Sequence, residues 1–157
     1  MIYTSNYKNC NTNIYKTISI SGDRGKKENY DKEYFPLLAP KLSFWITWHN
    51  NINTIDELEN NKFYIKEYYE QVLSKLDPKE IFELLDNSII LCYEDYNEFC
   101  HRHIVAEWLE LTLNIKVNEI KIKNNYIIKL KRPEYIKPIL EEIIKEDNNL
   151  KIIKKIR

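Results

Sequence analysis

Strands and helices are predicted to alternate along the chain, because two different spacings of hydrophobic residues follow one another. Short segments with apolar or alternating side chains, bounded by turn residues, predict strands at residues 2–5, 16–21 and 88–93. Apolar residues at helical spacing predict helices at residues 63–76, 78–85 and 100–113. Such alternation is typical of an α/β fold in which helices flank a central, mostly parallel sheet. The uninterrupted apolar segment 88–93 is expected at the centre of that sheet, where both faces are covered.

The remaining segments have weaker patterns. Residues 117–122 and 126–130 alternate as strands do, and we expect them to pair across the polar turn between them. Residues 133–146 predict a helix, after which residues 150–156 fit a final strand or a frayed tail. Residues 29–53 are rich in aromatic side chains and contain two prolines, so we expect a long loop or lid with short helical turns.

A length of 157 residues suits one domain with one core, so we expect residues 1–157 to form a single α/β domain. The formal net charge is zero, which argues against a uniformly basic nucleic-acid-binding protein. The charges are unevenly distributed, because residues 116–157 hold 12 Lys and Arg against 6 Asp and Glu. A basic region of this kind can attract phosphates, but a solvated lysine-rich surface has the same composition.

Membrane insertion and secretion are not expected. No apolar run approaches the ~20 residues needed to cross a bilayer, and the N-terminal residues lack the apolar core of a signal peptide. The cysteines are odd in number, at Cys10, Cys92 and Cys100. We interpret them as the free thiols of a cytoplasmic protein rather than as a disulfide framework.

The two glycines of the chain lie in one turn after the second predicted strand. Gly22 and Gly25 enclose the pair Asp23-Arg24. Glycine adopts positive φ without strain and allows another group to approach the backbone closely. We therefore expect the backbone of this turn to need positive φ or a close approach to another group.

The segment from Cys92 to His103 concentrates reactive side chains. Cys92 lies near the carboxyl end of the predicted central strand, the edge at which open α/β sheets bind ligands. Cys100 opens the next helix, whose free N–H groups and dipole favour a thiolate or a bound anion. His101 can transfer a proton near neutral pH, and Arg102 can hold a phosphate or carboxylate through two hydrogen bonds. The pattern predicts a reactive thiol beside an anion-binding helix start.

Structural interpretations of the same residues stay open. Cys92 and Cys100 belong to a residue type that is often buried as a small apolar side chain, and His101 can be a hydrogen-bonded core residue. His103 is expected on the solvated face of the helix. Arg102 can simply pair with a carboxylate of the preceding loop. The carboxylates of that loop belong to Glu94, Asp95 and Glu98.

The same side chains could instead bind a metal ion or form a redox pair. The two cysteines could ligate zinc or iron together with His101 and His103, although the spacing lacks a Cys-x-x-Cys motif. A redox pair of Cys92 and Cys100 requires the loop between them to fold back. The preferred interpretation involves no metal and no cofactor.

Short motifs spread over about residues 1–113 occur in the order and character of a known family. They are Ile2-Tyr3-Thr4-Ser5, Ile18-Ser19-Ile20-Ser21, Leu38-Ala39-Pro40, Leu76-Asp77-Pro78, Leu91-Cys92-Tyr93-Glu94, Cys100-His101-Arg102 and Ala106-Glu107-Trp108-Leu109. Together they resemble the family called domain of unknown function 488. The most specific feature is a strand-end Cys, a short acidic loop and a Cys-His-Arg helix start. The resemblance implies a small α/β protein without an assigned reaction and leaves the basic region 114–157 outside the family core.

The resemblance also implies which side chains share one cleft with the start of the Cys100 helix. These side chains are expected at the carboxyl ends of strands, and they are Thr4, Ser5, Ser21, Asp23, Arg24, Cys92 and Glu94. The aromatic stretch from Phe44 to Trp48 is expected either to stack on a base in this cleft or to pack within its own loop.

These residues lead us to expect a small enzyme that acts on an anionic, nucleotide-like or nucleic-acid substrate. Arg24, Arg102 and the helix start would hold the anion. Cys92 or Cys100 would be the nucleophile, with His101 as the acid and base. The alternative is a non-catalytic module that binds a ligand or nucleic acid, with a structural Cys-His-Arg segment. The sequence leaves the oligomeric state open.

Overall fold

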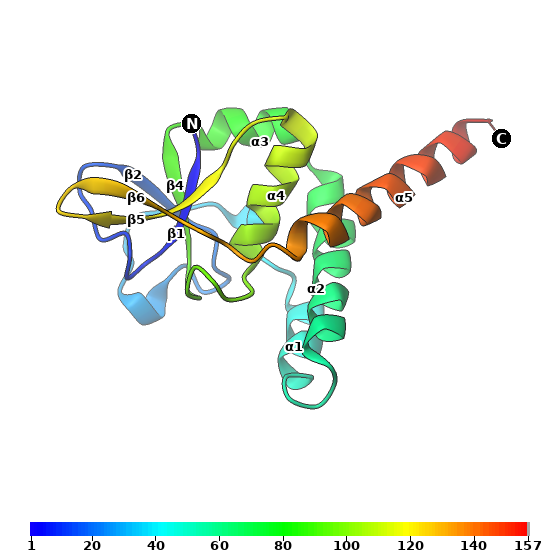
Figure 1. Ribbon diagram of the computed structural model, residues 1–157, viewed down its shortest axis with the longest axis horizontal. Helices are drawn as coiled ribbons and strands as arrows, with labels where there is room; N and C mark the ends of the chain where they lie inside the picture. The colour runs from blue at the N-terminus through cyan, green and yellow to red at the C-terminus, as the bar shows by residue number, and fades with distance from the viewer. Residues whose placement is uncertain (157) are drawn as a thin grey trace.

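A six-stranded sheet forms the centre of the computed structural model, which describes residues 1–156. Its strands are β1 (Tyr3–Asn6), β2 (Lys16–Ser19), β3 (Glu33–Tyr34), β4 (Ser88–Cys92), β5 (Asn118–Lys123) and β6 (Tyr126–Leu130). They lie in the order β3-β2-β4-β1-β5-β6 (Figure 1). Neighbouring strands are parallel except β5 and β6, which form the antiparallel hairpin predicted from the sequence. The expected α/β fold with a mostly parallel sheet is confirmed.

Strand β4 lies between β1 and β2, where its side chains are covered on both faces. All five of its residues are buried. Ile90 belongs to the larger hydrophobic core, whereas Ile89 and Leu91 belong to a smaller core on the opposite face. Since side chains alternate along a strand, Cys92 shares the face of Ile90. The last residue of the central strand therefore points toward the helices.

Helices cover one face of the sheet. They are α1 (Leu42–Asn50), α2 (Glu57–Gln71), α3 (Pro78–Leu85), α4 (His101–Leu113) and α5 (Ile136–Ile156), with the 3₁₀ segments η1 (Lys26–Glu28), η2 (Pro36–Leu38) and η3 (Leu73–Lys75). The larger core joins α2, α3, α4 and α5 to the sheet. The smaller core is covered by tyrosine-rich loops that follow β1 and β2. In Figure 1, α1 and α2 lie side by side, and α5 runs outward to the C-terminus.

Capping residues set the start of two helices. Asp77 accepts a backbone N–H at 3.0 Å, and α3 covers Pro78–Leu85 as the sequence predicts. Helix α2 begins earlier than expected, because Asp56 accepts the N–H of Glu59 at 3.1 Å and caps the helix at Glu57. The prediction followed apolar spacing alone and so missed this polar first turn.

Two segments differ from the sequence predictions in type. Residues 42–50, expected within a long loop or lid with only short helical turns, form the longer helix α1, and Phe44 packs edge-on against Tyr64 and Tyr68 of α2. A helix this short is marginal in isolation, so packing on α2 is what stabilises it. Residues 150–156 continue α5, and the expected strand or frayed tail is wrong. Neither glycine nor proline interrupts that stretch, so the helix continues.

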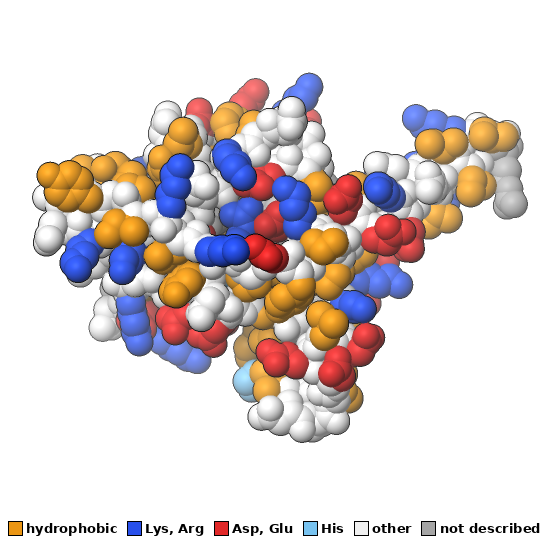
Figure 2. Space-filling view, viewed as in Figure 1, with side chains coloured by type: hydrophobic (Ala, Val, Ile, Leu, Met, Phe, Trp, Pro, Cys, Tyr) orange, Lys and Arg blue, Asp and Glu red, His pale blue; other side chains and the backbone are white. Residues whose placement is uncertain are grey.

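Helix α5 combines lysines with apolar side chains at its outer end. The exposed apolar residues there are Leu150, Ile152, Ile153 and Ile156. Figure 2 shows this mixture of lysine and apolar side chains along the projecting end of the molecule. No helix among residues 1–156 is long and apolar enough to cross a bilayer.

Gly22 and Gly25 have different environments although they flank the same dipeptide. Gly25 has φ +83°, and a Cβ there would lie 2.8 Å from Tyr30 Cβ and 2.8 Å from Tyr7 Cζ. A Cβ on Gly22 would meet nothing within 4 Å. The expected need for positive φ or close approach in this turn is confirmed at Gly25, whereas Gly22 does not have positive φ and a Cβ there would face open space.

Gly25→Ala is expected to lower the free energy of unfolding by about 1–3 kcal/mol, because strain at positive φ adds to the contact with two tyrosines. Gly22→Ala is the matched control, and its effect should stay within about 0.5 kcal/mol. Urea unfolding of both variants measures the difference. An equal loss of stability in the two variants would contradict the distinction between these turn positions.

Candidate functional site

A cavity of ≈ 740 Å³ lies where the chain leaves β2 and β4 and enters α4. This is the carboxyl edge of the parallel strands, where open α/β sheets bind ligands. Helix α1 closes another side of it through Leu42, Trp45 and Trp48. Several residues that the sequence suggested do line this cavity, namely Ser21, Asp23, Cys92, Glu94, Cys100 and His101.

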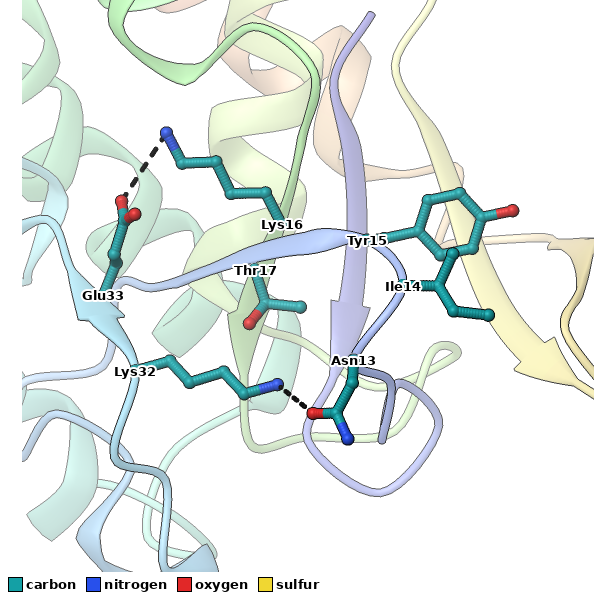
Figure 3. Close-up of a pocket in the computed structure, with 7 residues that line it drawn as sticks. All are labelled: Asn13, Ile14, Tyr15, Lys16, Thr17, Lys32 and Glu33. Atoms are coloured by element: carbon teal, nitrogen blue, oxygen red, sulfur yellow. Dashed lines mark hydrogen bonds and ion pairs between the residues drawn. The ribbon is translucent and has the colours of Figure 1, made fainter.

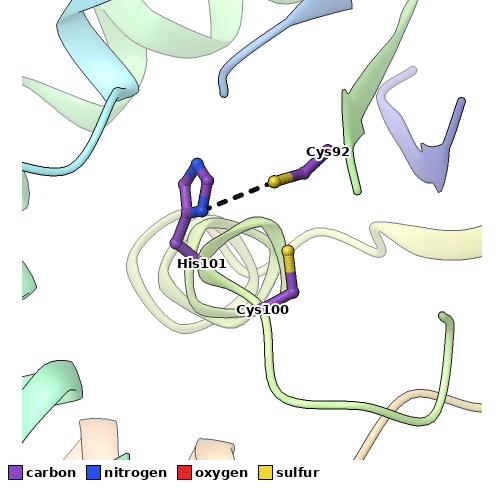
Figure 4. Close-up of side chains that lie close together, drawn as sticks. All are labelled: Cys92, Cys100 and His101. Carbon is purple, nitrogen blue, oxygen red and sulfur yellow. Dashed lines mark hydrogen bonds between the residues drawn. The ribbon is translucent and has the colours of Figure 1, made fainter. Parts of the chain in front are cut away.

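Cys92, Cys100 and His101 all line the cavity, and their side chains lie close together, as Figure 4 shows. Cys92 ends β4, Cys100 is the N-cap of α4, and His101 is the first residue of that helix. Cys92 Sγ lies 3.6 Å from His101 Nδ1. All three side chains are buried, so their reactive atoms meet away from bulk water.

The imidazole of His101 is oriented by a backbone carbonyl. His101 Nε2 lies 2.9 Å from the carbonyl oxygen of Ile20. A carbonyl only accepts, so Nε2 carries the proton and Nδ1 of the neutral ring is an acceptor facing Cys92 Sγ. Burial lowers the pKa of His101, but its contacts with Cys100, the Ile20 carbonyl and Glu94 together outweigh burial and raise that pKa above its usual value. His101 is thus placed to take a proton from Cys92.

Other polar groups contact the sulfur of Cys92. The hydroxyl of Ser21 donates to Cys92 Sγ at 3.5 Å, and Tyr7 holds that hydroxyl through a hydrogen bond of 2.7 Å. The Cys92 thiol also faces Glu94 Oε2 at 3.6 Å. The Cys92 sulfur therefore contacts one hydrogen-bond donor, the Ser21 hydroxyl. It also contacts two groups that can exchange protons, the His101 imidazole and the Glu94 carboxyl group.

Glu94 can act as an acid or a base near neutral pH. Burial, followed by the neighbouring Cys100, raises the pKa of Glu94 to about 7. A carboxyl group with such a pKa is populated in both protonation states under physiological conditions. Glu94 can therefore deliver a proton to a group leaving from a substrate in the cavity.

Glu94→Gln should remove a pH dependence of stability. The pKa of Glu94 is higher in the folded than in the unfolded chain, so the folded state keeps a proton that the unfolded state loses. Stability of the natural protein should therefore fall as pH rises from about 4.5 to about 7, because the half-buried carboxyl group becomes charged over this range. We expect the melting temperature of Glu94→Gln, relative to the natural protein, to increase across this range. Glu98→Gln, in the same loop but exposed, is the control and should show no such trend.

Cys100 does not have the electrostatics that its position at a helix start suggested. Burial, followed by the neighbouring Cys92, raises the pKa of the Cys100 thiol to about 12, and the opposite effect of Arg102 is smaller. The expected depressed pKa of Cys100 is therefore wrong. Cys100 is therefore a protonated neighbour, and Cys92, whose sulfur contacts His101 and Ser21, is the better placed of the two thiols.

Arg102 lies beneath the cavity and does not line it. Its side chain is 0% exposed, and its Nε and Nη2 donate to the Glu119 carboxylate at 3.1 and 2.8 Å. The hydroxyl of Thr4 donates to the same carboxylate at 2.7 Å. The remaining arm of the guanidinium, Nη1, donates to Cys100 Sγ at 3.3 Å. Arg102 thus pairs with a carboxylate of β5 instead of one in the preceding loop.

The resemblance placed Thr4, Ser5 and Arg24 in the cleft, but none of these three residues lines the cavity. Thr4 and Ser5 occupy the middle of β1, which continues to Asn6, and Ser5 donates to a backbone carbonyl of β5 at 2.6 Å. They are not at the carboxyl end of a strand, where the resemblance placed them. The guanidinium of Arg24 lies over the Tyr34 ring, 5.0 Å from its centroid.

His103 is buried, and its expected position on a solvated helix face is wrong. Its side chain is 0% exposed, and its Nδ1 is 3.8 Å from Glu119. Burial, followed by Arg102, lowers the pKa of His103 well below its usual value, so the ring is neutral. Helix α5 packs against α4, and Arg132 pairs with Glu107 at 2.6 Å beside it. The polar face of α4 is therefore covered by a segment that follows it in sequence.

Aromatic rings form another part of the cavity lining. Phe99 packs edge-on against Tyr64 at 5.3 Å between ring centroids and lies 5.7 Å from Trp48. Trp45 is 37% exposed and stacks on His49 at 4.8 Å. The sequence suggested the aromatic stretch of α1 as a base-stacking segment, but not its partners from α2 and from the loop before α4. No local signal marks those partners, because only the packing of separate elements brings them to the cavity.

A polar edge completes the lining. The Tyr93 hydroxyl donates to the Asp23 carboxylate at 2.7 Å, and the backbone N–H of Lys27 donates to that hydroxyl at 3.1 Å. These contacts hold the turn after β2 against the end of β4. Lys27 is another lining residue that the sequence did not indicate.

A second cavity, of ≈ 620 Å³, lies at the opposite end of β2. Its side chains pair with one another, as Figure 3 shows. Lys16 lies 3.6 Å from Glu33, and Lys32 donates to Asn13 at 3.1 Å. None of the residues that line this second cavity belongs to the cysteine cluster or to the site predicted from the sequence.

The cysteine cluster could also hold a metal ion. One ligand atom each from Cys92, Cys100 and His101 lies within 4.8 Å of the others. Two thiolates and an imidazole are ligands that zinc accepts, with a fourth position left toward the cavity. His103, which the sequence added to this set, is directed to Glu119 instead.

The comparison with protein families gives one match. Residues 2–113 match the model of DUF488-N3a, described as the active DUF488-N3 subclade. No curated protein and no solved structure matches the chain. The matched residues contain the strands, the acidic loop and the Cys-His-Arg helix start that build the cavity. The chain therefore belongs to the domain of unknown function 488 family, in its DUF488-N3a subclade.

Proposed function

We propose that the protein is a cysteine-dependent enzyme that attacks a planar, nucleotide-like substrate through Cys92. The observation that carries this proposal is the distance of 3.6 Å between Cys92 Sγ and His101 Nδ1 at the wall of the cavity. A nucleophile within reach of an oriented base is the arrangement used in covalent catalysis. The description of the matched subclade as active supports a retained activity.

His101 acts as the base in this proposal. The hydrogen bond from Nε2 to Ile20 leaves Nδ1 free to accept the thiol proton of Cys92. Ser21 then donates to the sulfur and holds it in place. Glu94 lies beside the same sulfur and gives a proton to the leaving group.

The aromatic wall favours a flat ring as the part of the substrate that enters the cavity. Trp45, Trp48 and Phe99 offer faces and edges on which a nucleobase can stack. Lys27 and the start of α4 supply the positive potential for an anionic group. Arg24 and Arg102, the cations first expected to hold the anion, do not enter this argument because neither lines the cavity.

The reactivity of the thiols tests the proposed nucleophile. Cys92 should react with iodoacetamide in the folded protein much faster than Cys10, which is buried on the opposite face of the sheet and whose pKa burial raises to about 12. Peptide mass spectrometry after timed exposure measures both rates, and Cys10 is the internal control. Equal rates for the two thiols would overturn the role of Cys92.

Nucleoside monophosphates test the substrate class. They should quench tryptophan fluorescence and protect Cys92 from alkylation. Trp45→Ala should weaken their binding by about 1–3 kcal/mol, roughly 5- to 150-fold, if a base stacks at the cavity mouth. Tyr126→Ala, at the exposed tip of the β5–β6 hairpin, is the matched aromatic control. Nucleotide binding that depends on Trp45, together with an unreactive Cys92, would support the binding-module alternative.

A metal-dependent reaction is the second candidate function. It is favoured by the closeness of the ligand atoms of Cys92, Cys100 and His101, which lie within 4.8 Å of one another. Metal analysis of the purified protein separates the two candidates. One equivalent of zinc, lost in Cys92→Ser and Cys100→Ser and retained in Cys10→Ser, would favour the metal centre over the free thiol.

A further inference from the structure

We propose that Cys100 is a resolving thiol for Cys92, so that the cavity also supports reduction of a hydroperoxide with closure of a Cys92–Cys100 disulfide. This inference rests on the proposed function in one respect, since it uses Cys92 as the attacking thiol. It goes beyond that function by giving Cys100 a covalent role and the protein a redox activity.

The positions of the two sulfur atoms carry the proposal. Each side chain is 3% exposed, both line the same cavity, and their Sγ atoms lie within 4.8 Å. Cys92 ends β4 and Cys100 caps α4, so the loop of residues 93–99 folds back and brings the two thiols together. A disulfide requires the two sulfur atoms to approach from this separation to a bond length of about 2.05 Å.

The pair is separated from the third thiol. Cys10 belongs to the smaller core on the opposite face of the sheet, with Tyr7 and Ile89. The larger core and the cavity lie on the helix side of β4. Exchange between Cys10 and the pair would require the sheet to open, so an oxidised product formed in the folded protein should join Cys92 to Cys100.

Arg102 contacts the Cys100 sulfur and opposes, without outweighing, the effect of burial on the pKa of that thiol. Its Nη1 donates to Cys100 Sγ at 3.3 Å, and its other two donors are held by Glu119 at 3.1 and 2.8 Å. The guanidinium is therefore fixed and directed at the sulfur. When a disulfide opens by attack on Cys92, the electron pair of the S–S bond goes to Cys100, and a positive charge in contact stabilises the leaving thiolate.

The chemistry balances in three steps. The Cys92 thiolate attacks the outer oxygen of the hydroperoxide, an S–O bond forms, the O–O bond breaks, and the leaving alkoxide takes a proton from Glu94 or protonated His101. Cys100 then attacks the Cys92 sulfur, an S–S bond forms, and the hydroxyl leaves with the Cys100 proton as water. Two electrons from two thiols reduce the hydroperoxide, and an external dithiol reopens the disulfide.

Oxidation of the full-length protein with hydrogen peroxide tests this proposal. The natural protein should lose the mass of two hydrogen atoms, and peptide mapping should find Cys92 linked to Cys100. Cys10→Ser should behave in the same way. Cys100→Ser should instead gain one oxygen at Cys92, which dimedone traps as the sulfenic acid. Cys92→Ser should resist oxidation under the same exposure.

Arg102→Lys tests the leaving-group argument. The disulfide of this variant should form but reopen more slowly with dithiothreitol than the disulfide of the natural protein, because an ammonium group cannot keep the forked contact with Glu119 and Cys100. Circular dichroism of the variant shows whether it is folded. If it is not, the slower reopening is sought in Glu119→Gln.

The contradicting results differ from those that would overturn the proposed function. A sulfenic or sulfinic acid on Cys92 in the natural protein, with Cys100 left as a free thiol, would overturn the resolving role while keeping Cys92 as the nucleophile. Cys92 that reacts with neither iodoacetamide nor peroxide would overturn both. Linkage of Cys10 to either cysteine would show that oxidation follows unfolding and would also overturn the inference.

Discussion

Replacing Arg102 with alanine is expected to lower the free energy of unfolding by about 3–5 kcal/mol, because it leaves a buried carboxylate without its cation. The side chains of Arg102 and Glu119 are both 0% exposed and are joined by two hydrogen bonds. Thr4 supplies only one further donor to that carboxylate. Chemical unfolding of the variant beside the natural protein measures the loss.

An exposed ion pair provides the control for this prediction. Lys131 and Glu134 lie 2.7 Å apart with side chains 79% and 77% exposed, so Lys131→Ala should change stability by less than about 1 kcal/mol. Glu119→Ala should cost about as much as Arg102→Ala, since it leaves the guanidinium unpaired. A loss below about 1 kcal/mol for Arg102→Ala, combined with weaker phosphate binding, would instead return Arg102 to the anion-binding role suggested by the sequence.

Replacing His101 with glutamine is expected to slow alkylation of Cys92 by roughly 10²- to 10⁴-fold near neutral pH, the usual contribution of a positioned base. The glutamine amide can still donate to the carbonyl of Ile20, so the fold and the cavity should be kept. The amide cannot take the thiol proton, which leaves Cys92 in its less reactive form. Timed alkylation with peptide mass spectrometry measures the rate.

His49→Gln serves as the matched histidine control. His49 is exposed on α1, stacks on Trp45 and does not line the cavity. Its replacement should leave the alkylation rate of Cys92 within a factor of about two, since it removes no contact with the sulfur. A His101→Gln rate equal to that of the natural protein would remove His101 from the mechanism. Thermal melting of both histidine variants checks that a slower reaction does not reflect unfolding.

The sequence predicted the framework of the site through local signals. The apolar segment after Asn87 indicated a central buried strand, and Asp77-Pro78 indicated where α3 begins. The Cys-His-Arg segment was expected at a helix start after that strand, and α4 begins at His101. Because these features depend on residues close in sequence, the chain pattern alone places Cys92, Cys100 and His101 at one edge of the sheet.

The sequence could not predict the electrostatics of the site, because these depend on contacts between distant segments. A thiol at a helix start is usually activated, but burial outweighs the helix start and Arg102 at Cys100. The carboxylate that pairs with Arg102 belongs to Glu119, which lies 17 residues further along the chain, on β5. The pattern of one helix contains no information about which strand packs beneath its first turn.

Considered by itself, the sequence determined the α/β class, the hairpin of β5 and β6, and the start of α4 after the central strand. It did so because hydrophobic periodicity and capping residues act over a few neighbouring positions. The tertiary structure decided that Cys92, Cys100 and His101 meet, that Arg102 and His103 are buried, that Thr4 and Ser5 lie within a strand, and that aromatic rings from separate elements line the same cavity. Those outcomes depend on the strand order and on the packing of α5 over α4, and burial in those contacts sets the charge and the accessibility of each side chain.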